Sequence, residues 1–356
     1  MSKVFREFLK KIGSGPHTGQ NLDREEAAIA ARMMLLGEAT PAQIGAFLIA
    51  HRIKRPTGAE LAGMLDAYAE LGPKLEPIKR SSHKVFVLGS PYDGRSRTAP
   101  LSPLTALILA TAGIDVILHG GDRMPTKEGL PLIEVWQYLD VSWQHLSLVQ
   151  VQQVLETTGI GFVYLPTHFP QAQHLVTYRR EIGKRPPLAT LELMWCPYQG
   201  SAEVVSGFVH PPTEIVMREA YNLRGSQALT TVKGLEGSCD LPRERTAIIG
   251  LSSPRQDFFE RLCLHSKDYN SGGKNVELQE LDAQAMQAVL AGESFSKGEA
   301  MPTELMLSTL WNTGFYLWRS GITPDISTGM AKAESLLREK LVLAKLQELQ
   351  TVVKNI

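Results

Sequence analysis

The stretch VFVLGSPYDGRSR, residues 85–97, joins a short apolar run to a tight polar loop. Val85 to Leu88 form the apolar run, and glycines, a proline and an aspartate then interrupt it. This pattern predicts a buried strand followed by a turn. Loops between a strand and a helix hold phosphate groups in many α/β proteins, because backbone N–H groups point at the anion there. Arg95 and Arg97 add positive charge to the loop.

Further apolar, β-branched runs follow, and most of them end in glycine or proline. Helical stretches such as residues 103–113 and 131–139 lie between them, and the tail is helical from about residue 301. Strands that alternate with helices predict a mostly parallel sheet covered by helices on both faces. We therefore expect an α/β domain over residues 84–356. The strands are expected at residues 84–89, 113–121, 159–166, 228–234 and 245–250.

Residues 1–73 are predicted to form a small all-helical domain. Three polar pairs there fit the capping box that starts a helix, and apolar residues at helical spacing follow each pair. A linker of residues 72–84 comes next. The segment 171–195 is also predicted to be helical and to pack back on this domain. The capping pairs are Asp23 with Glu26, Thr40 with Gln43, and Thr57 with Glu60.

The composition is that of an ordinary globular chain of 356 residues, with 43% hydrophobic and 21% charged residues. Lysine plus arginine and aspartate plus glutamate both number 37, which argues against a generally basic nucleic-acid binder but not against a local basic patch. The three cysteines have no metal-binding spacing, and neither a signal peptide nor an apolar stretch of 18 residues is found. We therefore expect a cytoplasmic protein with no membrane span.

The order of the motifs resembles the anthranilate phosphoribosyltransferase family, of the nucleoside phosphorylase/phosphoribosyltransferase fold. GEATPAQIGAFLIAHRIKRPTGAELAGM, residues 37–64, is similar to that family's helical domain. LATAGIDVILHGGDRMPTKEG, residues 109–129, lies where the family has an HGNRSVSSKSG loop. Residues 165–197 follow the family's PxxHPAMKHVxPVRRELG segment and its continuation. The resemblance covers nearly the whole chain and implies the family's fold.

The catalytic motifs of the family are altered at several positions. The diphosphate loop GTGGD corresponds to GSPYD at residues 89–93, and Pro91 there lacks an N–H donor. The acidic GxDGLDE motif, which holds magnesium in the family, corresponds to GLEGSCD at residues 234–240. A thiol at Cys239 is a poor magnesium ligand, which leaves Asp240 as a weak candidate. We therefore expect no catalytic residues and no cofactor.

One branch of the family, outside tryptophan synthesis, replaces the glycine loop with a PSYNGxR…NLTP-like sequence, and GSPYDGRSRTAPLSP at residues 89–103 resembles that form. The resemblance implies a homodimer that binds single-stranded nucleic acid through a basic groove without phosphoribosyl transfer. We expect dimerisation through the N-terminal helices.

The candidate phosphate-binding residues come from the loops after the strands and from the segment 171–195. Parallel strands end at one edge of a sheet, so these loops should face each other across an inter-domain cleft. Tyr92 could stack on a base, although packing within the loop explains it equally well. The resemblance implies that Arg179 contacts a substrate carboxylate. The candidates are Gly89, Tyr92, Asp93, Arg95, Arg97, Ser102, His119, Arg123, Lys127, Arg179 and Arg185.

Two alternatives remain open from the sequence. The protein could be an active phosphoribosyltransferase that uses Mg²⁺ and moves phosphoribosyl from its diphosphate to anthranilate or a related acceptor. Asp93, Lys127, Arg179 and Asp240 would then carry the reaction. It could also be a structural or regulatory dimer that binds no nucleic acid, which the neutral net charge favours.

Overall fold

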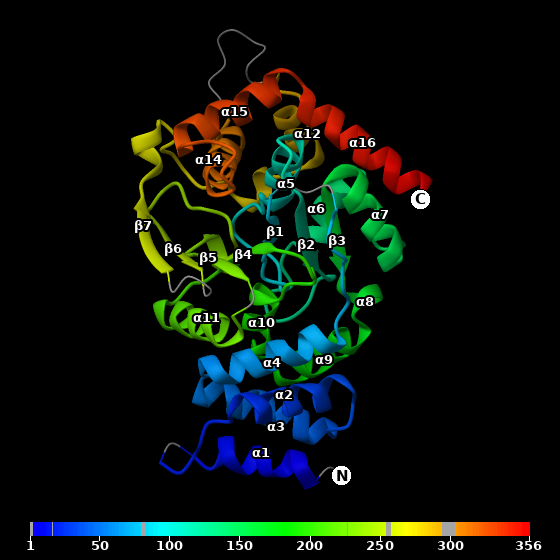
Figure 1. Ribbon diagram of the computed structural model, residues 1–356, viewed down its shortest axis with the longest axis vertical. Helices are drawn as coiled ribbons and strands as arrows, with labels where there is room; N and C mark the ends of the chain where they lie inside the picture. The colour runs from blue at the N-terminus through cyan, green and yellow to red at the C-terminus, as the bar shows by residue number, and fades with distance from the viewer. Residues whose placement is uncertain (1–2, 16, 80–82, 226, 254–257, 294–302) are drawn as a thin grey trace.

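The computed structural model describes residues 3–15, 17–79, 83–225, 227–253, 258–293 and 303–356. A helical layer formed by the N-terminal segments lies at one end of the molecule, and an α/β layer occupies the rest (Figure 1). The predicted class, a small helical domain followed by an α/β domain with a mostly parallel sheet, is confirmed.

Four helices form the N-terminal layer, and their starts follow the predicted local chemistry. In each of the three capping boxes, the side chain of the residue before the helix accepts a hydrogen bond from the backbone N–H of the third helical residue. The side chain of that third residue accepts a hydrogen bond from the backbone N–H of the residue before the helix. The three predicted capping boxes are thus confirmed. The helices are α1 (Lys3–Gly13), α2 (Arg24–Leu35), α3 (Pro41–Lys54) and α4 (Gly58–Leu71).

The segment after strand β3 (Ile160–Tyr164) returns to this layer. It contains α8 (Leu165–His168), α9 (Pro170–Ile182) and α10 (Leu188–Met194), so the stretch expected to be one helical segment is broken. The break follows Gly183, which has φ 58° and ends α9 in the left-handed conformation. Helix α9 contacts α2 and α3, whereas α10 contacts α4. The layer therefore includes residues from two distant parts of the chain.

A seven-stranded sheet in the order β3-β2-β1-β4-β5-β6-β7 forms the centre of the α/β layer. The first five strands are parallel, and β6 and β7 join antiparallel to one edge. Strands β4 and β7 were not expected from the sequence, whereas the other five lie where they were predicted. The strands are β1 (Val85–Leu88), β2 (Val116–Gly120), β3 (Ile160–Tyr164), β4 (Ala202–Gly207), β5 (Ala228–Val232), β6 (Ala247–Ser253) and β7 (Phe258–Leu264).

Helices cover the sheet and bury its apolar side chains. Helix α5 contacts the C-terminal helices α14, α15 and α16, and α11 joins the sheet to α4 of the N-terminal layer (Figure 1). No helix among the described residues is long and apolar enough to cross a membrane. The covering helices are α5 (Ser102–Thr111), α6 (Leu132–Tyr138), α7 (Leu148–Thr158), α11 (Pro211–Arg224), α12 (Ala283–Leu290), α14 (Glu304–Arg319), α15 (Ile326–Arg338) and α16 (Leu341–Asn355).

Candidate functional site

Two of the predicted loops meet directly at the carboxyl end of the sheet. The loop after β1 pairs with the loop after β2, because Arg95 and Leu130 exchange backbone hydrogen bonds of 3.0 and 2.7 Å. A Cβ atom on Gly129 would lie 2.6–2.8 Å from backbone atoms of Arg95, so only glycine permits this approach. The prediction that these two loops face each other is confirmed.

The loop after β5 brings a carboxylate to the backbone of the first loop. Glu236 accepts hydrogen bonds from the backbone N–H groups of Ser96, Arg97 and Thr98, at 3.2, 3.0 and 3.0 Å. Lys127 Nζ lies 3.1 Å from the same carboxylate. Consecutive backbone N–H groups of this kind form an anion site, and here the anion belongs to the chain itself.

The pKa of Glu236 reflects these partners. Burial alone would raise this pKa, but the backbone hydrogen bonds from Thr98 and Arg97 and the charges of Arg95 and Lys127 hold it well below its ordinary value. The Glu236 side chain is only 3% exposed. The carboxylate is therefore ionised throughout the physiological range.

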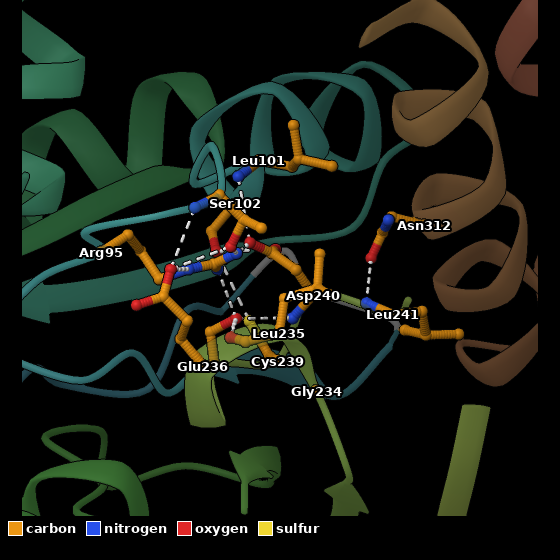
Figure 2. A network of polar contacts seen from close by, with 12 residues as sticks. Arg95, Leu101, Ser102, Gly234, Leu235, Glu236, Cys239, Asp240, Leu241 and Asn312 are labelled. Atoms are coloured by element: carbon orange, nitrogen blue, oxygen red, sulfur yellow. Dashed lines mark hydrogen bonds and ion pairs between the residues drawn. The ribbon is translucent and has the colours of Figure 1, made fainter. Parts of the chain in front are cut away.

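Arg95 lies between Glu236 and a second carboxylate (Figure 2). Its Nη1 donates to Asp240 at 2.8 Å and to the Ser238 hydroxyl at 2.7 Å, and its Nε lies 3.4 Å from Glu236. The Arg95 side chain is 2% exposed. Two internal carboxylates therefore engage the buried guanidinium of Arg95, which was expected to contact a phosphate.

Asp240 is enclosed by donors from the start of α5. Its Oδ2 accepts from the backbone N–H of Leu101 at 3.1 Å, and its Oδ1 accepts from the hydroxyl of Ser102 at 3.2 Å (Figure 2). Ser102, expected at a phosphate, thus donates a hydrogen bond to Asp240 in this structure. Among the described residues, no group of three or more His, Cys, Asp and Glu side chains is arranged to hold a metal ion.

Tyr92 and His119 form a buried pair in the same region. The Tyr92 hydroxyl lies 2.7 Å from His119 Nδ1, and the His119 ring packs against Trp195 at 5.1 Å between centroids. Burial lowers the pKa of His119 to about 4, so its ring is neutral at physiological pH. Tyr92 is 4% exposed, which places it in the core rather than where a base could stack.

A second buried ion-pair group surrounds Arg179. Its Nη1 donates to Glu192 at 2.9 Å, and its Nη2 lies 3.5 Å from Asp93. Arg185 lies 3.7 Å from the other oxygen of Asp93. A cavity of about 20 Å³ beside Arg179 and Glu192 has room for about one water molecule.

The remaining candidates lie near the surface or support the backbone. Arg123 is paired with Glu134 at the surface, and Arg97 is exposed. At Gly89 an added Cβ would lie 2.4 Å from the carbonyl oxygen of Leu193, so this glycine allows close packing of β1 on α10. A surface ion pair, an exposed side chain and close backbone packing thus describe these three residues in the structure.

An open cleft lies beside these groups, between the N-terminal layer and the α/β layer. It has a volume of about 920 Å³, and we name it the arginine cleft. Among the described residues, the lining side chains that are charged at neutral pH are those of Arg52, Arg55 and Arg185, and no carboxylate lines it. The other lining residues are Ile53, Pro56, Pro186, Pro187, Ala189, Thr190, Leu193, Gly207, Phe208, Val209, His210, Pro211, Pro212, Thr213, Val216 and Gly237.

Sequence reasoning found Arg185 but missed the other two arginines of the cleft. Arg52 and Arg55 end α3 in the run HRIKRP, which lies about 130 residues before Arg185. Arg52 donates to the backbone carbonyl of Arg185, so the two segments meet directly. The basic residues at the end of α3 are visible in the sequence. Their position beside the loop between β4 and α11 depends on tertiary packing, which the sequence does not show locally.

This chain is similar to known proteins in both sequence and fold. Residues 6–72 match the family described as "Glycosyl transferase family, helical bundle domain". Anthranilate phosphoribosyltransferase of Ralstonia pickettii is 26% identical over 90% of both chains, and that of Acetivibrio thermocellus is 28% identical over 96% of this chain and 95% of its own length.

Solved structures give the same result for the fold. Anthranilate phosphoribosyltransferase of Thermus thermophilus superposes with a TM-score of 0.78 at 21% identity, over 99% of this chain and 100% of its own. The enzyme of Saccharomyces cerevisiae in complex with PRPP and Mg superposes with a TM-score of 0.81 at 16% identity, over 100% of this chain and 99% of its own. A helical bundle joined to a mostly parallel sheet, with loops gathered at the carboxyl ends of its strands, is the fold that this chain shares with these anthranilate phosphoribosyltransferases. The chain is thus similar to anthranilate phosphoribosyltransferases over 90–96% of its length.

Proposed function

We propose that this protein binds single-stranded nucleic acid in the arginine cleft and does not transfer phosphoribosyl groups. The observation that carries the proposal is the charge of the cleft walls. Within the described part of the chain, three arginines and no carboxylate line it, on a chain whose formal net charge is zero. Arginine forks bind phosphate oxygens with paired N–H groups, and such binding needs no metal.

The rest of the cleft suits the other parts of a nucleotide. Its volume of about 920 Å³ is in the upper part of the range for small-molecule sites. Val209, Pro211 and Pro212 provide exposed apolar surface beside the arginines. Apolar surface can pack against bases without selecting a sequence, while the arginines contact the backbone. We therefore expect weak sequence preference.

The surroundings of Arg179 argue against transfer to an acceptor acid. Glu192 already places a carboxylate on this arginine, 2.9 Å away, and the adjoining cavity of about 20 Å³ is too small for an aromatic acid. Pro91 and Tyr92 stand in the first loop where the family has glycines, so fewer backbone donors face a diphosphate. These features support binding over catalysis.

A second candidate is an active phosphoribosyltransferase, and the names of its relatives favour it. The similar chains from Ralstonia pickettii and Acetivibrio thermocellus are both anthranilate phosphoribosyltransferases. Asp93, Lys127 and Arg179 would then carry the reaction. The test follows anthranilate fluorescence in the presence of phosphoribosyl diphosphate and Mg²⁺. We expect no turnover, and Mg²⁺-dependent consumption of anthranilate would establish this second function instead.

The binding proposal is tested by fluorescence anisotropy of a labelled single-stranded oligonucleotide at several salt concentrations. Three arginine contacts predict a slope of log affinity against log salt of roughly −2, since each neutralised phosphate of a single strand contributes about −0.7. A mononucleotide should bind much more weakly, because it can meet fewer arginines. Absence of binding even at low salt would reject the proposal and favour a structural or regulatory dimer.

A further inference from the structure

A relative of known structure was solved with PRPP and Mg, so the fold raises the question of where this chain would hold a divalent cation. The carboxylates available at the matching loop are Glu236 and Asp240. Mg²⁺ requires near-octahedral oxygen ligands at about 2.0–2.1 Å. The residues present do not fit such an ion, because each carboxylate oxygen already accepts from a donor of the protein.

The donors can be assigned oxygen by oxygen. Asp240 Oδ2 accepts from Arg95 Nη1 and from the Leu101 N–H, and Oδ1 accepts from Ser102. Glu236 Oε1 accepts from the N–H groups of residues 97 and 98, and Oε2 accepts from that of residue 96 and from Lys127. A metal ion would have to compete with these donors for the carboxylate oxygens.

Charge leads to the same conclusion. Two carboxylates, Glu236 and Asp240, face two cations, Arg95 and Lys127, so the group is neutral. The Arg95, Glu236 and Asp240 side chains are each 2–3% exposed. A divalent cation added to a balanced, buried group would carry uncompensated charge into a region of low dielectric.

We infer that the Arg95 guanidinium takes the charge-balancing role of a divalent cation between Glu236 and Asp240, so that this protein is independent of metal. Arg95 joins the loop after β1 to the loop after β5, as a bridging ion would (Figure 2). Asn312 Oδ1 supports the arrangement by accepting from the Leu241 N–H at 2.7 Å. This arrangement involves residues of this chain alone and does not depend on the ligand that occupies the arginine cleft.

The test measures Mn²⁺ alone, since its paramagnetism reports binding without any enzymatic activity. For the wild-type protein we expect no bound Mn²⁺ by electron paramagnetic resonance and no change of Tm with Mg²⁺ or a chelator. Arg95→Ala removes the internal cation and should bind Mn²⁺ in equimolar amount, with a Tm that rises as Mn²⁺ is added. Arg95→Ala/Asp240→Asn should lose this binding.

The matched control is Arg123→Ala, which removes an arginine whose partner Glu134 is near the surface. It should bind no Mn²⁺. If Arg95→Ala does not fold, Arg95→Lys keeps the charge and should remain folded and free of Mn²⁺. Mn²⁺ bound by the wild type and lost in Asp240→Asn would overturn the inference. A folded Arg95→Ala protein that binds no Mn²⁺ would also overturn it.

Discussion

The carboxylate of Glu192 lies 2.9 Å from the guanidinium of Arg179, and the two side chains are 10% and 3% exposed. Arg179 is the arginine that the family resemblance assigns to a substrate carboxylate, and here α10 provides that carboxylate from within the chain. Burial raises the pKa of Glu192 and the repulsion of Asp93 adds to it, while the attraction of Arg179 and Arg185 opposes both. Glu192 therefore occupies the side of Arg179 that the resemblance assigns to a substrate carboxylate.

Removing Glu192 tests whether this pair stabilises the fold. Glu192→Ala leaves Arg179 buried with Asp93 at 3.5 Å as its remaining anion. Removing one partner of a buried ion pair lowers the free energy of unfolding by about 3–5 kcal/mol. Because the variant also relieves the repulsion between Glu192 and Asp93, we expect a loss of about 3 kcal/mol. Urea denaturation measures the change. Glu181→Ala, on the exposed side of α9, should stay within about 0.5 kcal/mol of wild type, and equal effects of both variants would contradict the account.

Two arginines of neighbouring loops should differ in their contribution to stability. Arg95→Met leaves two carboxylates buried, so we expect a loss of about 3–5 kcal/mol in the free energy of unfolding. Arg123→Ala removes one member of a surface pair that is 48% exposed on the arginine side, and should cost about 0–1 kcal/mol. Chemical denaturation in parallel measures both. A small effect of Arg95→Met would show that its internal contacts are weak.

Gly94 allows the first two loops to approach. It has φ 75°, and an added Cβ would lie 2.5 Å from the carbonyl group of Gly129. Gly94→Ala should therefore pay about 1–2 kcal/mol for its backbone conformation and about 1–3 kcal/mol for the clash. Gly113→Ala separates the two effects, because Gly113 has φ 93° but nothing within 4 Å of its Cβ position. Thermal unfolding of both variants should rank Gly94→Ala as the less stable.

Acid should destabilise the N-terminal layer through Glu60. Burial alone would raise the pKa of Glu60, but the His51 ring and the Lys54 ammonium outweigh it and lower this pKa to about 2. Because the pKa is depressed in the folded state, its contribution is complete above about pH 5 and disappears as the pH falls toward about 2. Glu60→Gln should reduce the slope of stability against pH in this window by at most about 1.4 kcal/mol per pH unit. The exposed Glu70→Gln should leave the slope unchanged.

Much of the fold could be predicted because its signals are local. The capping boxes at Asp23, Thr40 and Thr57 need only residues three positions apart, and the buried strands show as apolar runs. Strand β4 was missed because Glu203 interrupts its apolar run, although Glu203 is buried and neutralised by Arg319 at 2.6 Å. Strand β7 was missed because it forms an edge whose side chains are largely exposed.

The site could be predicted less well, since its partners are far apart in sequence. The loops around Arg95 and Lys127 could be placed at one edge of the sheet, but the partner of Arg95, Asp240, lies 145 residues away. No local pattern tells an arginine that binds a ligand from one that binds an internal carboxylate. The arginines of the cleft were missed for the same reason, because Arg52 and Arg185 are 133 residues apart.

The most direct test of the central claim locates nucleic-acid binding on the arginine cleft. Oligonucleotide affinity is measured by anisotropy for Arg52→Ala/Arg55→Ala/Arg185→Ala and for Lys10→Ala/Arg338→Ala/Lys354→Ala, which removes equal charge from exposed sites elsewhere. We predict that the cleft variant loses most of the affinity and that its salt slope falls by roughly 2, while the control resembles wild type. Equal affinity of the two variants would contradict the claim that the cleft is the binding site.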